Sequence, residues 1–152
     1  MANLSDYLPF EIDPANVNFT GGLMNGVVIG GVNPEAATFT TVVADSAVAG
    51  TQVANATGST TLDFSANQNF VLTLTGNVTL ANPTTETVGQ SGFIVMIQDA
   101  TGGHTVSLGT EYETAGGAGL SLSTAASTTD IVPYVVAASG RILLGEPQLA
   151  FG

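Results

Sequence analysis

The stretch that decides the fold is Asn69-Phe70-Val71-Leu72-Thr73-Leu74-Thr75. Side chains alternate along it, so that Phe70, Leu72 and Leu74 share one face while a valine and two threonines share the other. This period of two predicts a β-strand with one face in the core and the other half exposed.

A second stretch, Phe93-Ile94-Val95-Met96-Ile97, is apolar without alternation. Strands of this kind occur in the middle of a sheet that is covered on both faces. We therefore expect a central strand, with either both faces covered within the chain or one face covered by another subunit.

Glycine-containing turns separate the apolar runs on both sides of these stretches. Three dipeptides predict tight hairpin turns: Gly76-Asn77, Gly102-Gly103 and Ser139-Gly140. No window of ten residues holds the apolar spacing of a helix. Short strands every ~8 to 12 residues with Gly-rich turns indicate an all-β fold, specifically an antiparallel β-sandwich or jelly roll.

The first part of the chain differs from this pattern. Pro9 and Pro14 exclude a helix, which predicts an extended N-terminal arm over residues 1–20. A Gly/Thr-rich connector with short strands follows over 21–59, and the sandwich domain takes 60–152. The arm carries large apolar side chains that we expect to bind a partner: Tyr7, Leu8, Phe10 and Ile12.

Charge excludes two classes of partner. The 152 residues include twelve acidic side chains and one basic side chain, Arg141, for a net charge of −11. Binding to nucleic acid phosphates or to anionic membranes requires several lysines or arginines, so neither partner is expected. The chain also lacks an apolar run of ~20 residues and a basic, apolar leader, which predicts a soluble protein made in a cytosol.

The scarcity of basic residues also predicts an oligomer. Monomeric β-proteins protect their edge strands with lysine and other charges. Here only 9% of residues are charged and the mean hydropathy is +0.38. We therefore expect other subunits to cover the edges in an obligate homotrimer.

Few residues could support catalysis or hold a metal, because the chain has one histidine and no cysteine. His104 with Asp99 and either Ser107 or Ser121 could form a hydrolytic triad, but no Gly-x-Ser-x-Gly motif supports it. A histidine that begins a strand beside a turn explains His104 better.

Two acidic patterns could also support a functional site. Glu111 and Glu113 could act as paired carboxylates of a glycosidase, although two charges on a solvated edge explain them equally well. A calcium site could use Asp99, Glu111 or Asp130, but the usual calcium-loop spacing is missing. We expect no catalytic residue, metal or cofactor.

The connector contains the segment Gly26-Val27-Val28-Ile29-Gly30-Gly31-Val32-Asn33-Pro34-Glu35-Ala36-Ala37-Thr38-Phe39-Thr40-Thr41-Val42. This segment resembles one found in bacteriophage fibres and other virion-surface proteins. It departs from the usual pattern at Glu35 and Ala37. A β-rich domain of the same phage proteins is similar to residues 61–64, 69–77, 89–92 and 98–103. Together, these similarities imply a trimeric virion structural protein with no catalytic residue to carry over.

Chain length then distinguishes between the virion structural proteins of this class. The chain begins at its own Met1 and offers an arm, a connector and one domain, without the long shaft of a fibre. This favours a capsid decoration or cement protein on the outer capsid surface, whose arm and connector bind the major capsid protein. The alternative is a short tail fibre or receptor-binding tip that recognises a host glycan, for which Tyr112 and Tyr134 are the candidate aromatic platforms. A small hydrolase using His104 is a third possibility.

Overall fold

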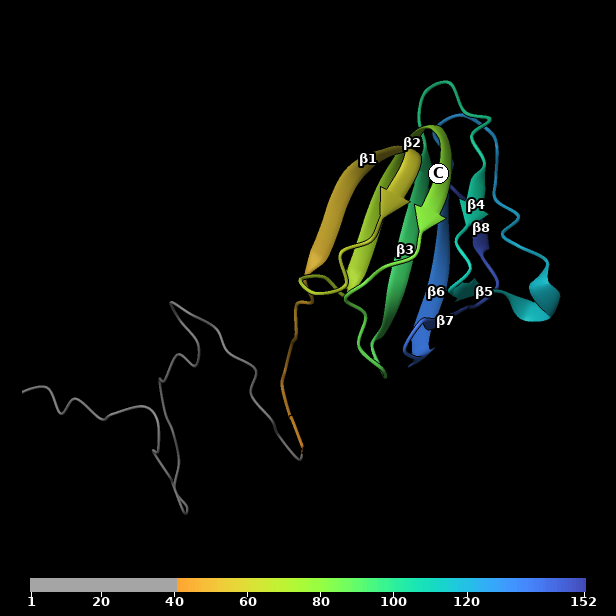
Figure 1. The fold of residues 1–152 in the computed structure, drawn as a ribbon. Helices are drawn as coiled ribbons and strands as arrows, with labels where there is room; N and C mark the ends of the chain where they lie inside the picture. The colour runs from red at the N-terminus through yellow and green to blue at the C-terminus, as the bar shows by residue number, and fades with distance from the viewer. Residues whose placement is uncertain (1–40) are drawn as a thin grey trace, which may run out of the picture. The chain divides into compact units, whose positions relative to one another are not determined.

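The computed structural model describes residues 41–152, and the strands between Thr51 and Phe151 form a single curled β-sheet (Figure 1). Its strands are β1 (Thr51–Thr61), β2 (Asn69–Ala81), β3 (Ser91–Gln98), β4 (Val106–Leu108), β5 (Tyr112–Glu113), β6 (Thr129–Ala138), β7 (Arg141–Leu144) and β8 (Gln148–Phe151). One short 3₁₀ turn, η3 (Ala115–Gly117), follows β5. Within the described residues no helix is long and apolar enough to span a bilayer.

Parallel and antiparallel strand pairs are mixed in this sheet. The strand order is β1-β2-β3-β6-β7-β5, with β4 beside β2 and β8 beside β6. Antiparallel pairing joins β6 to β3, β7 and β8, whereas β2 pairs in parallel with β1, β3 and β4, and β5 pairs in parallel with β7. The all-β class is confirmed, and the expected purely antiparallel pairing is corrected to a mixed sheet.

The glycine turns explain this difference, because only one of the three predicted hairpins forms. Ser139-Gly140 joins β6 to β7 in an antiparallel hairpin, as predicted. Gly76-Asn77 instead lies inside β2, where the pairing register with β1 shifts between Ala56 and Gly58. A Cβ atom at Gly76 would overlap Thr57 Oγ1, so this glycine allows close approach of the two strands rather than a chain reversal.

Gly102-Gly103 does not form a hairpin either. The strand that follows it, β4, pairs with β2 and not with β3. Gln98 redirects the chain: its amide nitrogen donates to the His104 carbonyl at 2.8 Å, and its Oε1 accepts from the His104 backbone N–H at 3.0 Å. These side-chain hydrogen bonds replace the backbone ladder that a hairpin would have formed.

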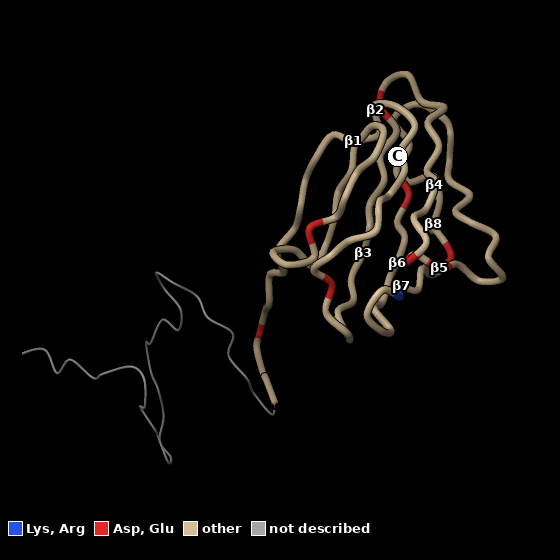
Figure 2. Tube along the Cα trace, viewed as in Figure 1, with Lys and Arg blue, Asp and Glu red and all other residues tan. Residues whose placement is uncertain are grey.

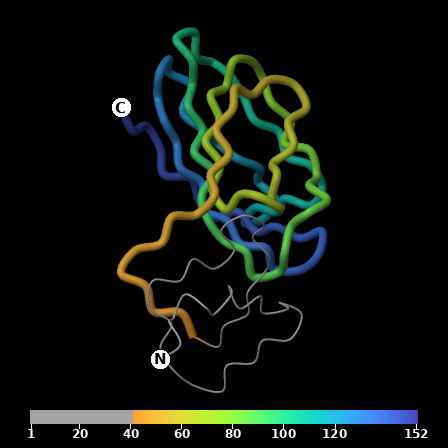
Figure 3. The backbone as a smooth tube through the Cα atoms, turned by 90° about the vertical axis from the view of Figure 1, so that its left-hand side faces the viewer, coloured from red at the N-terminus to blue at the C-terminus, as the bar shows by residue number. Residues whose placement is uncertain are grey.

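The parallel pairs make the sheet curl around its core (Figure 3). The first half of β2 pairs with β3, and its second half pairs with β4. The chain runs from β4 into β5, which pairs with β7 at the far end of the strand order. The backbone N–H of Gly109 donates to the Leu80 carbonyl and that of Ile142 donates to the Glu111 carbonyl, so residues 106–113 link β2 to β7.

Alternation along the strands fills the interior, as the sequence predicts. Phe70, Leu72 and Leu74 are fully buried. The rings of Phe64 and Phe70 lie 4.8 Å apart, and Tyr134 meets Phe64 edge-on at 5.4 Å. The remaining buried apolar side chains are Ala56, Leu62, Val78, Leu80, Ile94, Met96, Tyr112, Val132, Val136, Ile142 and Leu144.

The sheet begins earlier than the predicted sandwich. β1 starts at Thr51 and pairs with β2 along its length, so it crosses the predicted boundary between the connector and the domain at residue 60. The arm residues Tyr7, Leu8, Phe10 and Ile12 lie outside the described residues.

Candidate functional site

The most distinctive surface is the outer face of β1, β2, β3 and β6. Cross-strand pairing aligns Val53 with Val71, Val71 with Val95, and Val95 with Ile131. These residues alternate with core residues of the same strands, so they point away from the core. The result is a row of β-branched side chains across four strands.

Two further rows flank this central row. One contains Phe93, which pairs with Pro133 and whose backbone N–H donates a hydrogen bond to Asn69 Oδ1, 3.1 Å away. The other contains Ile97, which pairs with Thr73 and Thr129. We call these three rows the outer face.

The outer face is open to solvent in the isolated chain. Val53 is 74% exposed and Phe93 is 49% exposed, while Ile94 and Met96 on the opposite side of β3 are buried. The apolar run 93–97 is therefore covered on one face by the core, as expected for a central strand. The prediction that another subunit covers its second face stays a prediction.

Two shallow depressions of about 530 and 450 Å³ lie on this face and share Asn69 and Phe93 among their lining residues. Val71, Val95 and Ile131 line the larger one. Such apolar depressions accept another apolar surface more readily than a charged ligand.

The outer face carries no charged side chain. Strands β1, β2 and β3 contain no acidic or basic residue, and Asp130 of β6 points into the interior. Figure 2 shows the acidic residues of the described part gathered mainly in the loops at the strand ends. The uncharged surface is therefore bordered by anionic loops.

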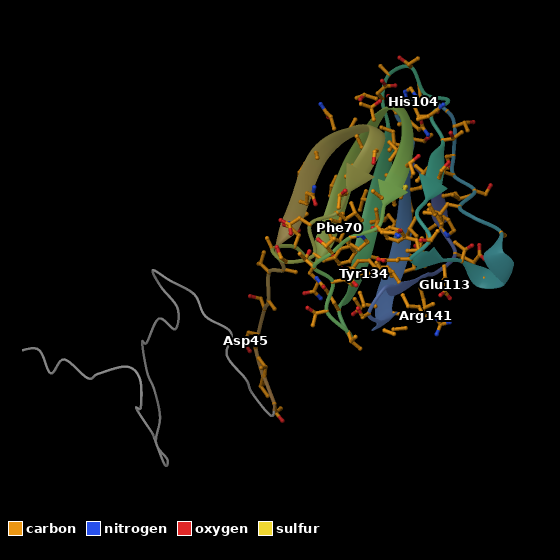
Figure 4. All side chains as sticks on the ribbon, in the orientation of Figure 1. Asp45, Phe70, His104, Glu113, Tyr134 and Arg141 are labelled. Carbon is orange, nitrogen blue, oxygen red and sulfur yellow. The ribbon has the colours of Figure 1, made fainter. Side chains whose placement is uncertain are left out.

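His104 lies in the loop after β3 (Figure 4), and Asp99 lies beside it, as the hydrolase alternative required. His104 Nε2 is 3.0 Å from Asp99 Oδ1. The same carboxylate oxygen accepts the backbone N–H groups of Thr101 and Gly102 at 2.8 and 3.0 Å, and the latter bond is the main reason that its pKa is lowered. Within residues 41–152, neither Ser107 nor Ser121 forms a hydrogen bond with His104.

Glu111 and Glu113 have different surroundings and do not act as a pair. Glu113 accepts two hydrogen bonds from Arg141, which lower the pKa of its carboxyl group. The Glu111 carboxyl group instead lies beside Gly140. This arrangement fits a structural ion pair better than the two opposed carboxylates of a glycosidase.

Asp99, Glu111 and Asp130, the three carboxylates of the possible calcium site, do not form one cluster. Asp130 is buried and accepts the backbone N–H groups of Ser123 and Ala150, at 2.6 and 2.8 Å. Asp99 accepts backbone N–H groups of its own turn, and the Glu111 carboxyl group lies beside Gly140. No cluster of three or more potential metal ligands occurs in the part of the chain that the structure describes.

The predicted aromatic platforms for a glycan are wrong. Tyr112 and Tyr134 are only 5% and 4% exposed because strand alternation turns both rings into the core. The exposed aromatic side chains of the described strands are Phe93 and Phe151. The signal for Phe93 was its place in an apolar run that has no alternation.

The comparisons with known proteins give one match. A family model described as "Putative phage tail fibre C-terminal domain" matches residues 16–141, which is 126 of the 152 residues. Neither the curated proteins nor the solved structures contain a match to this chain.

Proposed function

The chain belongs to the family of phage tail fibre C-terminal domains, and from this premise we propose that it is a component of the tail fibre of a virion. Membership makes it a phage structural protein of tail-fibre type. The observation that carries the proposal is the extent of the match, which covers both the connector and the β-domain.

The match favours the tail-fibre alternative over the capsid cement protein expected from chain length. The capsid interpretation assigned shell binding to the arm and the connector. Residues 16–141 include the whole of the connector, so the segment thought to bind a shell belongs to a fibre family. The capsid surface is therefore the alternative location on the virion that an experiment must distinguish from the tail fibre.

We propose a structural rather than a catalytic role for the polar loop residues. Gln98, Asp99 and Asp130 use their side chains to hold backbone groups of neighbouring segments. His104 contributes its own backbone N–H and carbonyl to the same network. Substituting His104→Ala should leave virion assembly unchanged, whereas a hydrolytic activity lost with this variant would support the enzyme alternative.

Location on the virion is the direct test. Antibodies raised against residues 51–152 are applied to intact particles and detected with gold by electron microscopy. We expect labels on the fibres and none on the shell. Even labelling of the capsid surface would contradict the proposal and restore the decoration protein.

A truncated chain tests the arm in the same assay. A variant lacking residues 1–20 is supplied to particles that lack the wild-type protein. If the arm is the virion anchor, as its apolar residues predict, the truncated protein folds but label disappears from the particles. Full occupancy would assign attachment to the connector or the β-domain.

A further inference from the structure

We propose that Glu86 and Glu111 form a Ca²⁺ site at the turn between β6 and β7, beside the Tyr112 hydroxyl. This site is independent of the location on the virion and can be tested on the purified protein. It shares only Glu111 with the calcium site considered from the sequence. Three observations carry it: two carboxyl groups adjoin one turn, two buried oxygen atoms there lack a hydrogen bond, and the protein is short of positive charge.

Three connections between strands bring the two carboxyl groups to the same residue. Glu86, in the loop between β2 and β3, accepts the backbone N–H of Gly140 with Oε1 at 3.0 Å. Glu111 lies directly before β5, and a Cβ atom placed at Gly140 would lie 3.6 Å from its Oε1. Both carboxyl groups therefore adjoin Gly140, in the turn between β6 and β7.

Backbone hydrogen bonds hold Glu111 in this position. Its N–H donates to Asn82 Oδ1 at 3.1 Å, and its carbonyl accepts the N–H of Ile142 at 2.7 Å. Asn82 lies in the same loop as Glu86, and Ile142 lies in β7, the strand that follows Gly140. The segments that carry the rest of the site are thus tied directly to the Glu111 backbone.

Two buried side-chain oxygen atoms lack a hydrogen-bond partner within residues 41–152, and both belong to this site. They are Oε2 of Glu111 and the hydroxyl of Tyr112, a residue that is only 5% exposed. Burial raises the pKa of Tyr112, and the charges of Glu111 and Glu86 raise it further, so the phenol lies near both carboxyl groups. Buried polar atoms are nearly always paired. A bound cation pairs both, because the carboxylate binds the ion and the hydroxyl donates to a water molecule that the ion holds.

Charge identifies the ligand as a cation. The protein has twelve acidic side chains and one lysine or arginine, and that residue, Arg141, is already paired with Glu113. The positive charge that balances Glu86 and Glu111 therefore has to come from solution. Carboxylate and water oxygens are hard ligands that Ca²⁺ accepts in a flexible geometry, whereas Mg²⁺ requires a nearly ideal octahedron. A site assembled from three connecting segments fits Ca²⁺ better.

The small number of charged ligands sets the expected affinity. The site has two carboxylates and does not reach a cluster of three potential metal-binding side chains in the described part of the chain, so neutral oxygens and water complete the coordination. Ligand charge tunes calcium affinity, and a site of this kind belongs at the weak end, with a dissociation constant of ~10⁻⁴ to 10⁻³ M. Calcium bound here joins three connections of the curled sheet and stabilises its closure.

Isothermal titration calorimetry of the full chain, stripped of metal by a chelator, tests the site with Ca²⁺ alone. We expect one ion per chain and a melting temperature that rises with calcium concentration. Glu86→Gln and Glu111→Gln each remove one charged ligand and keep its shape, and each should weaken binding at least ~10-fold. Glu146→Gln is the matched control, because it removes the same charge from an exposed position between β7 and β8. It should bind calcium like the wild type.

Terbium luminescence tests the position of the ion. Tb³⁺ occupies oxygen sites that bind Ca²⁺, and energy transfer from a nearby tyrosine excites its emission. Tyr112→Phe should strongly reduce the tyrosine-excited emission, and Tyr134→Phe should reduce it less. Emission that is unchanged in Tyr112→Phe would place the ion elsewhere and overturn the assignment.

Circular dichroism shows whether the variants are folded. If Glu111→Gln is not, Glu86→Gln decides the test, because Glu86 lies in a loop outside the strands. A wild type that binds no calcium at ten times the expected dissociation constant overturns the proposal and leaves a proton or a water molecule as the partner of Glu111 Oε2. Equal binding by the wild type and both glutamine variants also overturns it, since calcium would then only screen the surface charge.

Discussion

The guanidinium of Arg141, the single basic side chain of the protein, forms a two-point ion pair with the Glu113 carboxylate. Nε lies 2.9 Å from Oε1 and Nη2 lies 3.0 Å from Oε2. The pair connects β7 to β5 at the end of the sheet where these strands pair in parallel (Figure 4). It therefore reinforces the closure of the curled sheet.

Substituting Arg141→Gln should lower the melting temperature slightly at neutral pH, because both side chains are about half exposed. The pKa of Glu113 is lowered by Arg141, so the pair stabilises the fold above the unfolded pKa of glutamate. This contribution is lost as the pH falls through the lowered, folded value. Melting curves at neutral and strongly acidic pH should show the variant converging on the wild type in acid. A difference that persists unchanged in acid would show that the charges are not its source.

Arg141 is also the only site for trypsin, and it lies at the start of β7 in the β6–β7 hairpin. Cleavage requires the local backbone to leave the sheet. We expect the native protein to be cut at least ~100-fold more slowly than the heat-denatured chain, as followed by mass spectrometry of the fragment 142–152. Rapid cleavage of the native protein would mean that the hairpin opens independently of the core.

The two buried tyrosines provide a matched pair of variants. The Tyr134 hydroxyl donates to the Gln68 carbonyl at 2.6 Å, whereas the Tyr112 hydroxyl has no protein partner among the described residues. Tyr134→Phe should reduce the free energy of unfolding by about 1 kcal/mol, and Tyr112→Phe should change it by less than ~0.5 kcal/mol or increase it. Denaturant titrations measure both. Equal losses of unfolding free energy in the two variants would show that the hydrogen bond of the Tyr134 hydroxyl does not stabilise the fold.

Tyr134 also predicts an alkaline transition. Burial raises its pKa to about 12, above the unfolded value of ~10. Its stabilising contribution is complete below the unfolded pKa and is lost as the pH rises through the folded one. Wild-type stability should therefore fall between these two pH values, and the fall should be smaller in Tyr134→Phe. Chemical denaturation across that range tests this, and an identical fall in both proteins would exclude Tyr134 as the group responsible.

The buried carboxylate of Asp130 should hold the C-terminal strand in place. It accepts the backbone N–H of Ala150 in β8 and that of Ser123 in the preceding loop. Asp130→Ala leaves both donors without an acceptor and should lower the free energy of unfolding by about 2 to 4 kcal/mol. Asp130→Asn keeps one acceptor oxygen and should have a smaller effect. Hydrogen exchange at Ala150 and Ser123 should accelerate in both variants, and unchanged protection at Ala150 would show that β8 is held by its pairing with β6 alone.

Local alternation was sufficient to predict several features of the fold. The alternation around Phe70 predicted a strand and its buried face, because a side-chain period of two depends only on the local backbone. The apolar run at Phe93 predicted a strand with two apolar faces, because successive side chains of a strand point to opposite faces. Ser139-Gly140 predicted a hairpin correctly, since a two-residue turn closes strands that are neighbours in sequence.

Other features depended on contacts between residues distant in sequence. Gly76 and Gly102 have the composition of hairpin turns, but Thr57 packs against the first and Gln98 redirects the chain after the second. The parallel partners of β2, the curl of the sheet and the burial of Tyr112 and Tyr134 follow from such contacts. The sequence by itself determined which segments are strands and which residues of a strand share a face. Only the tertiary structure decided which strands are neighbours, because pairing depends on long-range packing and hydrogen bonds that no local period encodes. It is this pairing that assembles Val53, Val71, Val95 and Ile131 into one uncharged row.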